Sequence, residues 1–543
     1  MKRAFYNGKI YLEEGKFAQA VITENGVFTH VGSVNELKPH MSNLDDMIDL
    51  GGKTVLPGFN DSHMHLYNVG LMRLILNLME IDSISGCIAA GKKYINDRGL
   101  APGEVVFSRG WNQDYFTDEQ RPLTRHDLDK ISTEHPIIAI RACGHLATCN
   151  SMALKVAGID RNTGDIPGGE IRKDDSGEPN GILTENALAL LADLKPPPSV
   201  EEMAEIIKTA MEYAVMHGIT SVQTNDIRDD NWRNMLEAYN LVFNRGEGIL
   251  RVYHQCCFTG AEGLKEFIAA GQRMGQGDVM HKIGPIKMFV DGSLGAHTAA
   301  MRKPYHDAPH TKGVLCMTEE ELDEMVDIAH QAGFGCVIHA IGDEAIDMVL
   351  ETYEKVNSRY SGGSKTGKNP LRHGVIHCQI TDMPILERFK QAEVLALVQP
   401  IFLHYDMKIV QSRVGENLAE TSYAFGTMNK LGVRVSYGTD APIEDVHTLN
   451  CVHCAVNRQD LKGNPKEGFY PKEKVTPAQA VDNYTAESAY ASFDENIKGR
   501  IAVGHLADMC VLDSDIFAID PFCIKEANVD MTILGGQIVY QRQ

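Results

Sequence analysis

Short apolar runs alternate with longer amphipathic stretches through the middle of the chain. The runs predict eight strands, at residues 55–59, 219–224, 251–255, 286–291, 335–339, 374–379, 395–399 and 433–440. Ser199 and Glu202 form a capping box at the start of one intervening helix. Thr318 and Glu321 form a second one. Strands that alternate with helices build parallel sheets, so the pattern predicts an α/β protein with a (β/α)8 TIM barrel.

The two ends of the chain show a different pattern, in which short strands alternate with turn residues. Asn25-Gly26 between two apolar runs predicts a hairpin near the N-terminus. Gly535-Gly536 separates two similar runs near the C-terminus. We therefore expect one small β-sandwich made from residues 1–55 and 491–543, with the barrel at residues 56–490 between them.

A long interval interrupts the barrel between the first and second predicted strands. It contains apolar runs at 105–107 and 136–140, and a glycine-rich stretch at 165–169. Lys195-Pro196-Pro197-Pro198 then has the composition of a stiff linker. One crossover helix needs far fewer residues, so residues 80–190 are predicted to form an inserted domain over the barrel mouth.

Composition and charge narrow the class of protein. Of the 543 residues, 43% are apolar and 23% charged, which is ordinary for a globular protein. The net charge of −21 and the lack of a basic cluster argue against a nucleic-acid partner. The chain has neither an apolar signal segment nor a run long enough to span a membrane, and 12 cysteines suit reduced thiols. These features predict a soluble cytoplasmic protein.

A pair of histidines follows the first predicted barrel strand, in Asp61-Ser62-His63-Met64-His65. Alternate residues of a strand face the same side, so His63 and His65 can bind one metal ion. Alone, such a pair is weak evidence, because two surface histidines near a turn look the same. Its place where a barrel strand reaches the catalytic rim favours a metal site.

Three more candidate ligands, His339, His377 and Asp440, lie at the ends of later predicted strands. Each is ambiguous alone, because a strand-end histidine can simply bond a backbone carbonyl. Four histidines and an aspartate at the ends of four strands together predict a metal centre. Imidazole and carboxylate ligands suit zinc, and catalytic sites keep a coordination position open for water.

With these residues the chain resembles the amidohydrolase superfamily, in the branch that includes N-substituted formamide deformylase. The resemblance covers nearly the whole chain. It rests on residues 56–65, 287–295, 339–343, the stretch around His377, 438–442 and 497–508. These motifs are specific for the superfamily and the branch, and only weakly specific for the substrate.

The resemblance implies a two-metal site. His63 and His65 would hold one ion, and His339 and His377 the second. Lys287 would bridge them as a carboxylated lysine, because burial lowers the pKa of a lysine until the neutral amine reacts with carbon dioxide. A lysine that snorkels from the strand end, beside a mononuclear site, is the alternative. The expected cofactor is Zn²⁺, one or two ions per chain, with another divalent metal left open.

Asp440 is expected to act as a metal ligand and as the general base that takes a proton from the metal-activated water. The expected reaction is hydrolysis of a C–N bond in an amide, formamide or cyclic amide of a small molecule. Ester hydrolysis or deamination on the same site is the alternative. An inactive scaffold of the same fold predicts missing ligands, whereas every expected position is filled. The resemblance also suggests a homodimer.

Two residues of the inserted region, Trp111 and His145, are candidates for substrate binding, with plain packing equally open for both. Cys451-Val452-His453-Cys454 resembles half a zinc site, but no second pair follows at suitable spacing. Buried helix thiols are the favoured interpretation there.

Overall fold

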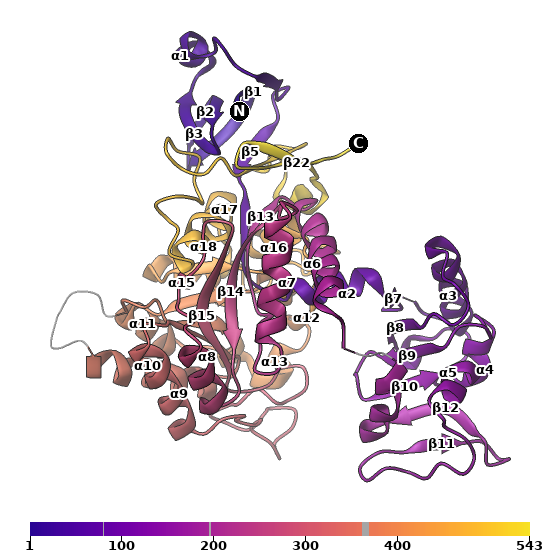
Figure 1. The fold of residues 1–543 in the computed structure, drawn as a ribbon. Helices are drawn as coiled ribbons and strands as arrows, with labels where there is room; N and C mark the ends of the chain where they lie inside the picture. The colour runs from indigo at the N-terminus through magenta and orange to yellow at the C-terminus, as the bar shows by residue number, and fades with distance from the viewer. Residues whose placement is uncertain (80, 195–196, 361–368) are drawn as a thin grey trace. The chain divides into compact units, whose positions relative to one another are not determined.

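The computed structural model describes residues 1–543 except 80, 195–196 and 361–368 (Figure 1). The chain divides into two compact units. One contains Met1–Asn68 and Ile207–Gln543, and the other is Val69–Ile206. Of the predicted linker at residues 195–198, residues 195–196 lie outside those described.

The first unit contains an eight-stranded parallel sheet in the order β19-β18-β17-β16-β15-β14-β13-β6. Its strands are β6 (Phe59–Met64), β13 (Ile219–Thr224), β14 (Arg251–Cys257), β15 (His281–Phe289), β16 (Cys336–Ala340), β17 (Gly374–His377), β18 (Leu395–Val398) and β19 (Val435–Tyr437). Every residue of β6, β13, β14, β17, β18 and β19 is buried, as expected for strands covered on both faces. The predicted α/β barrel is confirmed.

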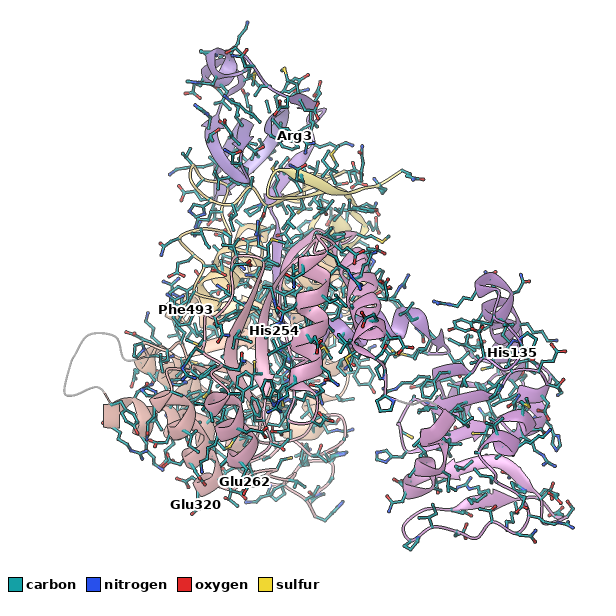
Figure 2. The ribbon with its side chains drawn as sticks, in the orientation of Figure 1. Arg3, His135, His254, Glu262, Glu320 and Phe493 are labelled. Carbon is teal, nitrogen blue, oxygen red and sulfur yellow. The ribbon has the colours of Figure 1, made fainter. Side chains whose placement is uncertain are left out.

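Helices connect the barrel strands and cover their outer face. They include α6 (Val200–Val215), α7 (Trp232–Asn244), α8 (Ala261–Ala269), α9 (Glu319–Gln331), α10 (Asp343–Tyr360), α11 (Met383–Ala392), α15 (Phe425–Leu431), α16 (Thr448–Asn457), α17 (Pro477–Tyr484) and α18 (Ala486–Ala491). Both predicted capping boxes are confirmed, Ser199 with Glu202 at α6 and Thr318 with Glu321 at α9. His254 of β14, labelled in Figure 2, meets Tyr239 of α7 at 4.6 Å between ring centroids.

The first barrel strand differs from the prediction at residues 55–59. That apolar run belongs to two strands, because β5 (Thr54–Pro57) pairs with β20 (Met509–Leu512) in another sheet, and β6 begins at Phe59. Gly58 joins them, and a Cβ there would lie 2.1 Å from the hydroxyl oxygen of Thr220. The predicted bounds are therefore wrong, and His63 lies within the barrel strand rather than beyond its end.

Both chain ends contribute to one further sheet, in the order β22-β21-β20-β5-β1-β2-β3, with β4 paired to β1. Its other strands are β1 (Lys2–Glu13), β2 (Lys16–Glu24), β3 (Val27–Gly32), β4 (Asp46–Asp49), β21 (Val529–Leu534) and β22 (Gln537–Gln541). Asn25 and Gly26 form the predicted turn, with φ of 53° and 85°. Phe5, Met509 and Ile533 share one buried core, which ties the two ends together.

A buried ion pair connects this sheet to the barrel. Arg251 of β14 donates two hydrogen bonds to Asp508, at 2.6 and 2.9 Å. Both side chains are 5% exposed. The two-pronged contact fixes the direction as well as the distance between the two groups.

The second unit is built on a six-stranded sheet in the order β11-β12-β10-β9-β8-β7. The strands are β7 (Leu76–Asn77), β8 (Val106–Trp111), β9 (Ile137–Arg141), β10 (Leu146–Cys149), β11 (Ile171–Lys173) and β12 (Pro179–Thr184). Helices α3 (Ile84–Arg98), α4 (Arg125–Asp129) and α5 (Ser151–Val156) accompany it. Within the described ranges of both units, no helix combines the length and apolar character needed to cross a bilayer.

A buried histidine at the start of β17 makes the stability of the barrel depend on pH. The backbone N–H of Cys336 donates to Nδ1 of His373 at 3.0 Å, so Nε2 carries the proton and faces Nδ1 of His330 at 3.1 Å. Burial, followed by the charge of His330, lowers the pKa of His373 to about 3. The folded protein therefore holds this imidazole neutral.

We expect the free energy of unfolding to fall as the pH drops below 6.5. In that range His373 takes up a proton in the unfolded chain but stays neutral in the folded protein. The contribution is full above pH 6.5 and is lost towards pH 3, at about 1.4 kcal/mol per pH unit. When urea unfolding is measured between pH 7 and pH 5, the free energy of unfolding should fall less steeply with pH for His373→Gln than for the wild type. Exposed His310 gives the control variant His310→Gln, which should keep the wild-type slope. Equal slopes for all three proteins would contradict this account.

Candidate metal centre

The six predicted ligands lie on five barrel strands, near the ends where parallel strands present their loops. His63 lies on β6 and His65 just after it, Lys287 on β15, His339 on β16, His377 on β17, and Asp440 after β19. The structure brings together predicted ligands that are far apart in the sequence.

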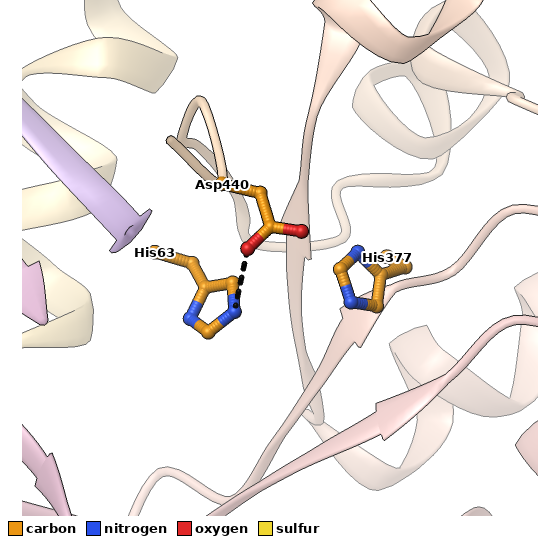
Figure 3. A group of neighbouring side chains, drawn as sticks. All are labelled: His63, His377 and Asp440. Atoms are coloured by element: carbon orange, nitrogen blue, oxygen red, sulfur yellow. Dashed lines mark ion pairs between the residues drawn. The ribbon is translucent and has the colours of Figure 1, made fainter. Parts of the chain in front are cut away.

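Three of these residues form a compact donor set. One ligand atom each from His63, His377 and Asp440 lies within 4.8 Å of the other two, and all three residues are buried. Figure 3 shows the Asp440 carboxylate between the two imidazoles, with Oδ1 3.4 Å from Nε2 of His63. Separations of this size fit side chains that gather around one ion or around two neighbouring ions.

The remaining two histidines adjoin this set. Nε2 of His65 is 3.2 Å from Oδ1 of Asp440. The ring of His339 lies 4.4 Å from that of His377. His65 and His339 thus adjoin different members of the set, and the division into two ions that the sequence resemblance implies stays a prediction.

Lys287 is fully buried. Burial lowers the pKa of its amine to about 7, against the opposing effect of the Asp440 charge. Throughout the described chain, Nζ of Lys287 and Oδ1 of Asp440 are among the buried polar atoms that form no hydrogen bond. Buried polar atoms nearly always have a partner, so these two fit a group that binds between them.

Burial also favours the neutral form of three of the histidines, His63, His339 and His377. It is the largest cause that lowers the pKa of His63 and His377 well below the ordinary value and that of His339 to about 3. Neutral imidazole is the form that binds metal ions, so the donor set is ready at neutral pH.

Two glutamines orient two of these imidazoles. Nδ1 of His63 lies 2.5 Å from Oε1 of Gln255, whose amide nitrogen donates to the Ser62 carbonyl. Nδ1 of His377 lies 2.8 Å from Oε1 of Gln399, whose amide nitrogen donates to the Leu397 carbonyl. Because each amide oxygen accepts from Nδ1, Nε2 of each histidine is left to face the metal position.

Backbone carbonyls orient the other two imidazoles. Nδ1 of His65 lies 3.2 Å from the Asn225 carbonyl oxygen, which leaves Nε2 towards Asp440. Nε2 of His339 lies 3.0 Å from the Gly292 carbonyl oxygen, which leaves Nδ1 available. The sequence patterns indicate no role for any of these four supporting residues, although Gln255 and Gln399 end two predicted strands.

Asp61 joins the first and last barrel strands beneath the ligands. Its carboxylate accepts from the backbone N–H of His63 at 3.1 Å and from the hydroxyl of Thr439 at 2.7 Å. The Tyr484 hydroxyl donates to it at 3.2 Å. Burial raises the pKa of Asp61 to about 7, against these hydrogen bonds. One side chain therefore fixes the backbone beside both His63 and Asp440.

The two candidates for substrate binding lie in the second unit. Trp111 is fully buried, and its indole N–H donates to the Ala139 carbonyl at 3.0 Å. These contacts fit a packing role for Trp111. The His145 side chain is exposed and lies 2.9 Å from Glu185. Substrate contact by either residue stays a prediction. Cys451 and Cys454 are buried free thiols on α16, as favoured.

Comparison with known proteins identifies the family of this chain. The amidohydrolase family model matches residues 46–540. This chain belongs to the amidohydrolase family. It is 32% identical to putative amidohydrolase YtcJ of Bacillus subtilis (strain 168), over the full length of both chains. N-substituted formamide deformylase of Arthrobacter pascens is 26% identical, over 97% of this chain and 95% of that one.

A solved structure supports the same assignment. An uncharacterized metal-dependent hydrolase from Pyrococcus horikoshii OT3 has a TM-score of 0.77 and 28% identity, over 96% of this chain and 99% of that one. The predicted membership of the amidohydrolase superfamily is confirmed.

We expect Gln255→Leu to lower the affinity for the metal ion by about 10- to 100-fold, because His63 loses the acceptor that holds its ring. Competition with a chromogenic chelator measures this affinity. Gln331→Leu, an exposed position on α9, is the matched control and should bind like the wild type. Unchanged affinity in Gln255→Leu would show that the ring is held in place without the glutamine.

Proposed function

We propose that this member of the amidohydrolase family hydrolyses a C–N bond of a small molecule, in an amide, formamide or cyclic amide. The observation that carries the proposal is the buried set of His63, His377 and Asp440 within 4.8 Å. The full-length similarity to N-substituted formamide deformylase supports a C–N bond as the target.

The residues present fit a divalent metal, and zinc suits a set made of imidazole and carboxylate. His63, His65 and Asp440 would hold one ion, and His339 and His377 a second. Lys287 would bridge them after reaction with carbon dioxide, which its buried and unbonded amine supports. When bound, the metal acidifies water and polarises a substrate carbonyl.

Asp440 moves the proton in the proposed reaction. Its Oδ1 faces His63 and His65 and forms no hydrogen bond within the described ranges of the chain. It takes a proton from the attacking water, whose oxygen bonds to the substrate carbonyl carbon. As the C–N bond breaks, Asp440 passes that proton to the leaving nitrogen and returns to a carboxylate. The cytoplasmic location and the dimer stay predictions.

Metal analysis of Lys287→Ala tests the bridging role. We expect about two zinc ions per wild-type chain and fewer in the variant, because the second ion loses its bridging ligand. Elemental analysis of protein purified without chelator gives the ratio, and Lys265→Ala, at an exposed position of α8, serves as the control. About one ion in every protein would assign Lys287 to structure and leave a mononuclear site.

Asp440→Asn should lower kcat much more than it lowers metal content, because the amide keeps a donor oxygen but cannot take a proton. A loss of about 100-fold or more is expected for a general base. The assay follows release of amine from a panel of formamides and amides, with the matching esters alongside. Asp445→Asn, an exposed position in the same loop, is the control. Equal loss of metal and turnover would contradict the base role.

A further inference from the structure

Asn225 is a buried polar residue next to the predicted metal ligand His65. Asn225 follows β13, is 1% exposed, and has an amide nitrogen and oxygen that both form no hydrogen bond in the part of the chain that the structure describes. Leaving such groups unpaired in a protein interior is costly, so a buried free amide calls for a ligand or water that satisfies it.

The backbone of Asn225 is fully engaged, which fixes where its side chain starts. Its N–H donates to the Met64 carbonyl at 2.8 Å, which continues the pairing of β13 with β6. Its carbonyl oxygen lies 3.2 Å from Nδ1 of His65. Asn225 is therefore bonded directly to a predicted metal ligand.

The neighbours of Asn225 show which side of the barrel wall its side chain takes. Thr224 donates to Asp226 at 2.7 Å, and Asp226 also accepts from Tyr239 of α7 at 2.6 Å. These two side chains thus face the helix layer outside the barrel. Successive residues of an extended chain face opposite sides, so Asn225 faces the barrel interior.

The side-chain amides of Gln255 and Gln399 differ from that of Asn225 in their hydrogen bonds. In Gln255 and Gln399, the amide oxygen faces a histidine and the amide nitrogen donates to a backbone carbonyl. Those amides are fully engaged in holding ligands. The Asn225 amide has one acceptor and one donor group that nothing in the described protein engages.

We propose that Asn225 binds the substrate and recognises an N–H on it, as an amide, imide or ureide presents. Oδ1 accepts from the substrate N–H. Nδ2 donates to a second polar atom of the substrate, which is the carbonyl oxygen where N–H and C=O lie on the same side, as in a cyclic amide, imide or ureide. This inference rests on the proposed function and narrows its substrate class. An ester lacks the N–H and leaves Oδ1 unpaired, so Asn225 selects amides over esters.

Asn225→Leu tests the proposal in the metal-loaded full-length enzyme. The substrates are a secondary alkyl formamide and the formate ester of the same alkyl group. The ratio of the two kcat/KM values should shift by about 10- to 100-fold towards the ester in the variant. Metal content should stay at the wild-type value. Tm should stay unchanged or rise, because leucine removes two unsatisfied polar atoms without changing the shape much.

Asn60→Leu is the matched control. Asn60 is another buried asparagine with an unpartnered amide, but it lies near the start of β6, away from the strand ends that hold the ligands. Its replacement should leave the formamide-to-ester ratio unchanged.

Several outcomes overturn the inference while the proposed function stands. An unchanged ratio in Asn225→Leu, with formamide hydrolysis by the wild type, shows that the amide does not select. A lower Tm assigns Asn225 to structure, and a loss of metal assigns it to the ligands. If the wild type hydrolyses no C–N bond, the proposed function fails instead. In that case the role of Asn225 is tested by the binding of an N-alkyl urea. The urea should raise the Tm of the wild type, and Asn225→Leu must abolish this rise.

Discussion

The contact between the first and eighth barrel strands is the constraint on which the metal centre depends. In the sheet order β6 and β19 are the two ends and are not paired with each other. They meet where Asp440 N–H donates to the His63 carbonyl and His65 N–H to the Ala441 carbonyl, both at 2.8 Å. The same residues are predicted ligands, so closing the barrel at this rim and building the His63, His65 and Asp440 part of the site are one structural event.

Such a close junction demands unusual local structure. A Cβ at Gly438 would lie 2.6 Å from the backbone nitrogen of His63, so only glycine lets the two strands approach. Asp440 adopts a left-handed backbone with φ of 57°, which few residue types accept readily. Asp61 is buried where its carboxylate bonds both strands, and this burial raises its pKa. Backbone and burial costs of this kind concentrate at functional sites, where the rest of the fold holds them in place.

The sequence predicted the parts of this design that leave a local signature. Apolar runs located the barrel strands, and histidines at their ends marked the centre. The run at 55–59 misled because hydrophobicity does not tell which sheet a strand joins, and Pro57 and Phe59 belong to different ones. Gln255 and Asn225 left no signature, since their roles depend on neighbours 192 and 160 positions away. An uncharged amide acquires its role from strand register, which spacing within one strand cannot show.

The charges around the site point to the kind of group it holds. Asp61, Asp291 and Asp440 are buried, and in the described ranges no lysine or arginine forms an ion pair with any of them. Backbone N–H groups bond Asp61 and Asp291 instead, and burial still raises the pKa of each to about 7. Burial also disfavours the protonated, positively charged form of the nearby Lys287 amine. Neutral histidines and a lysine that loses its charge easily do not balance the negative charge of these buried carboxylates, whereas a divalent cation would balance it. The neutral acceptors Gln255 and Gln399 fit the same balance, because carboxylates in their place would neutralise the charge that activates water and carbonyl.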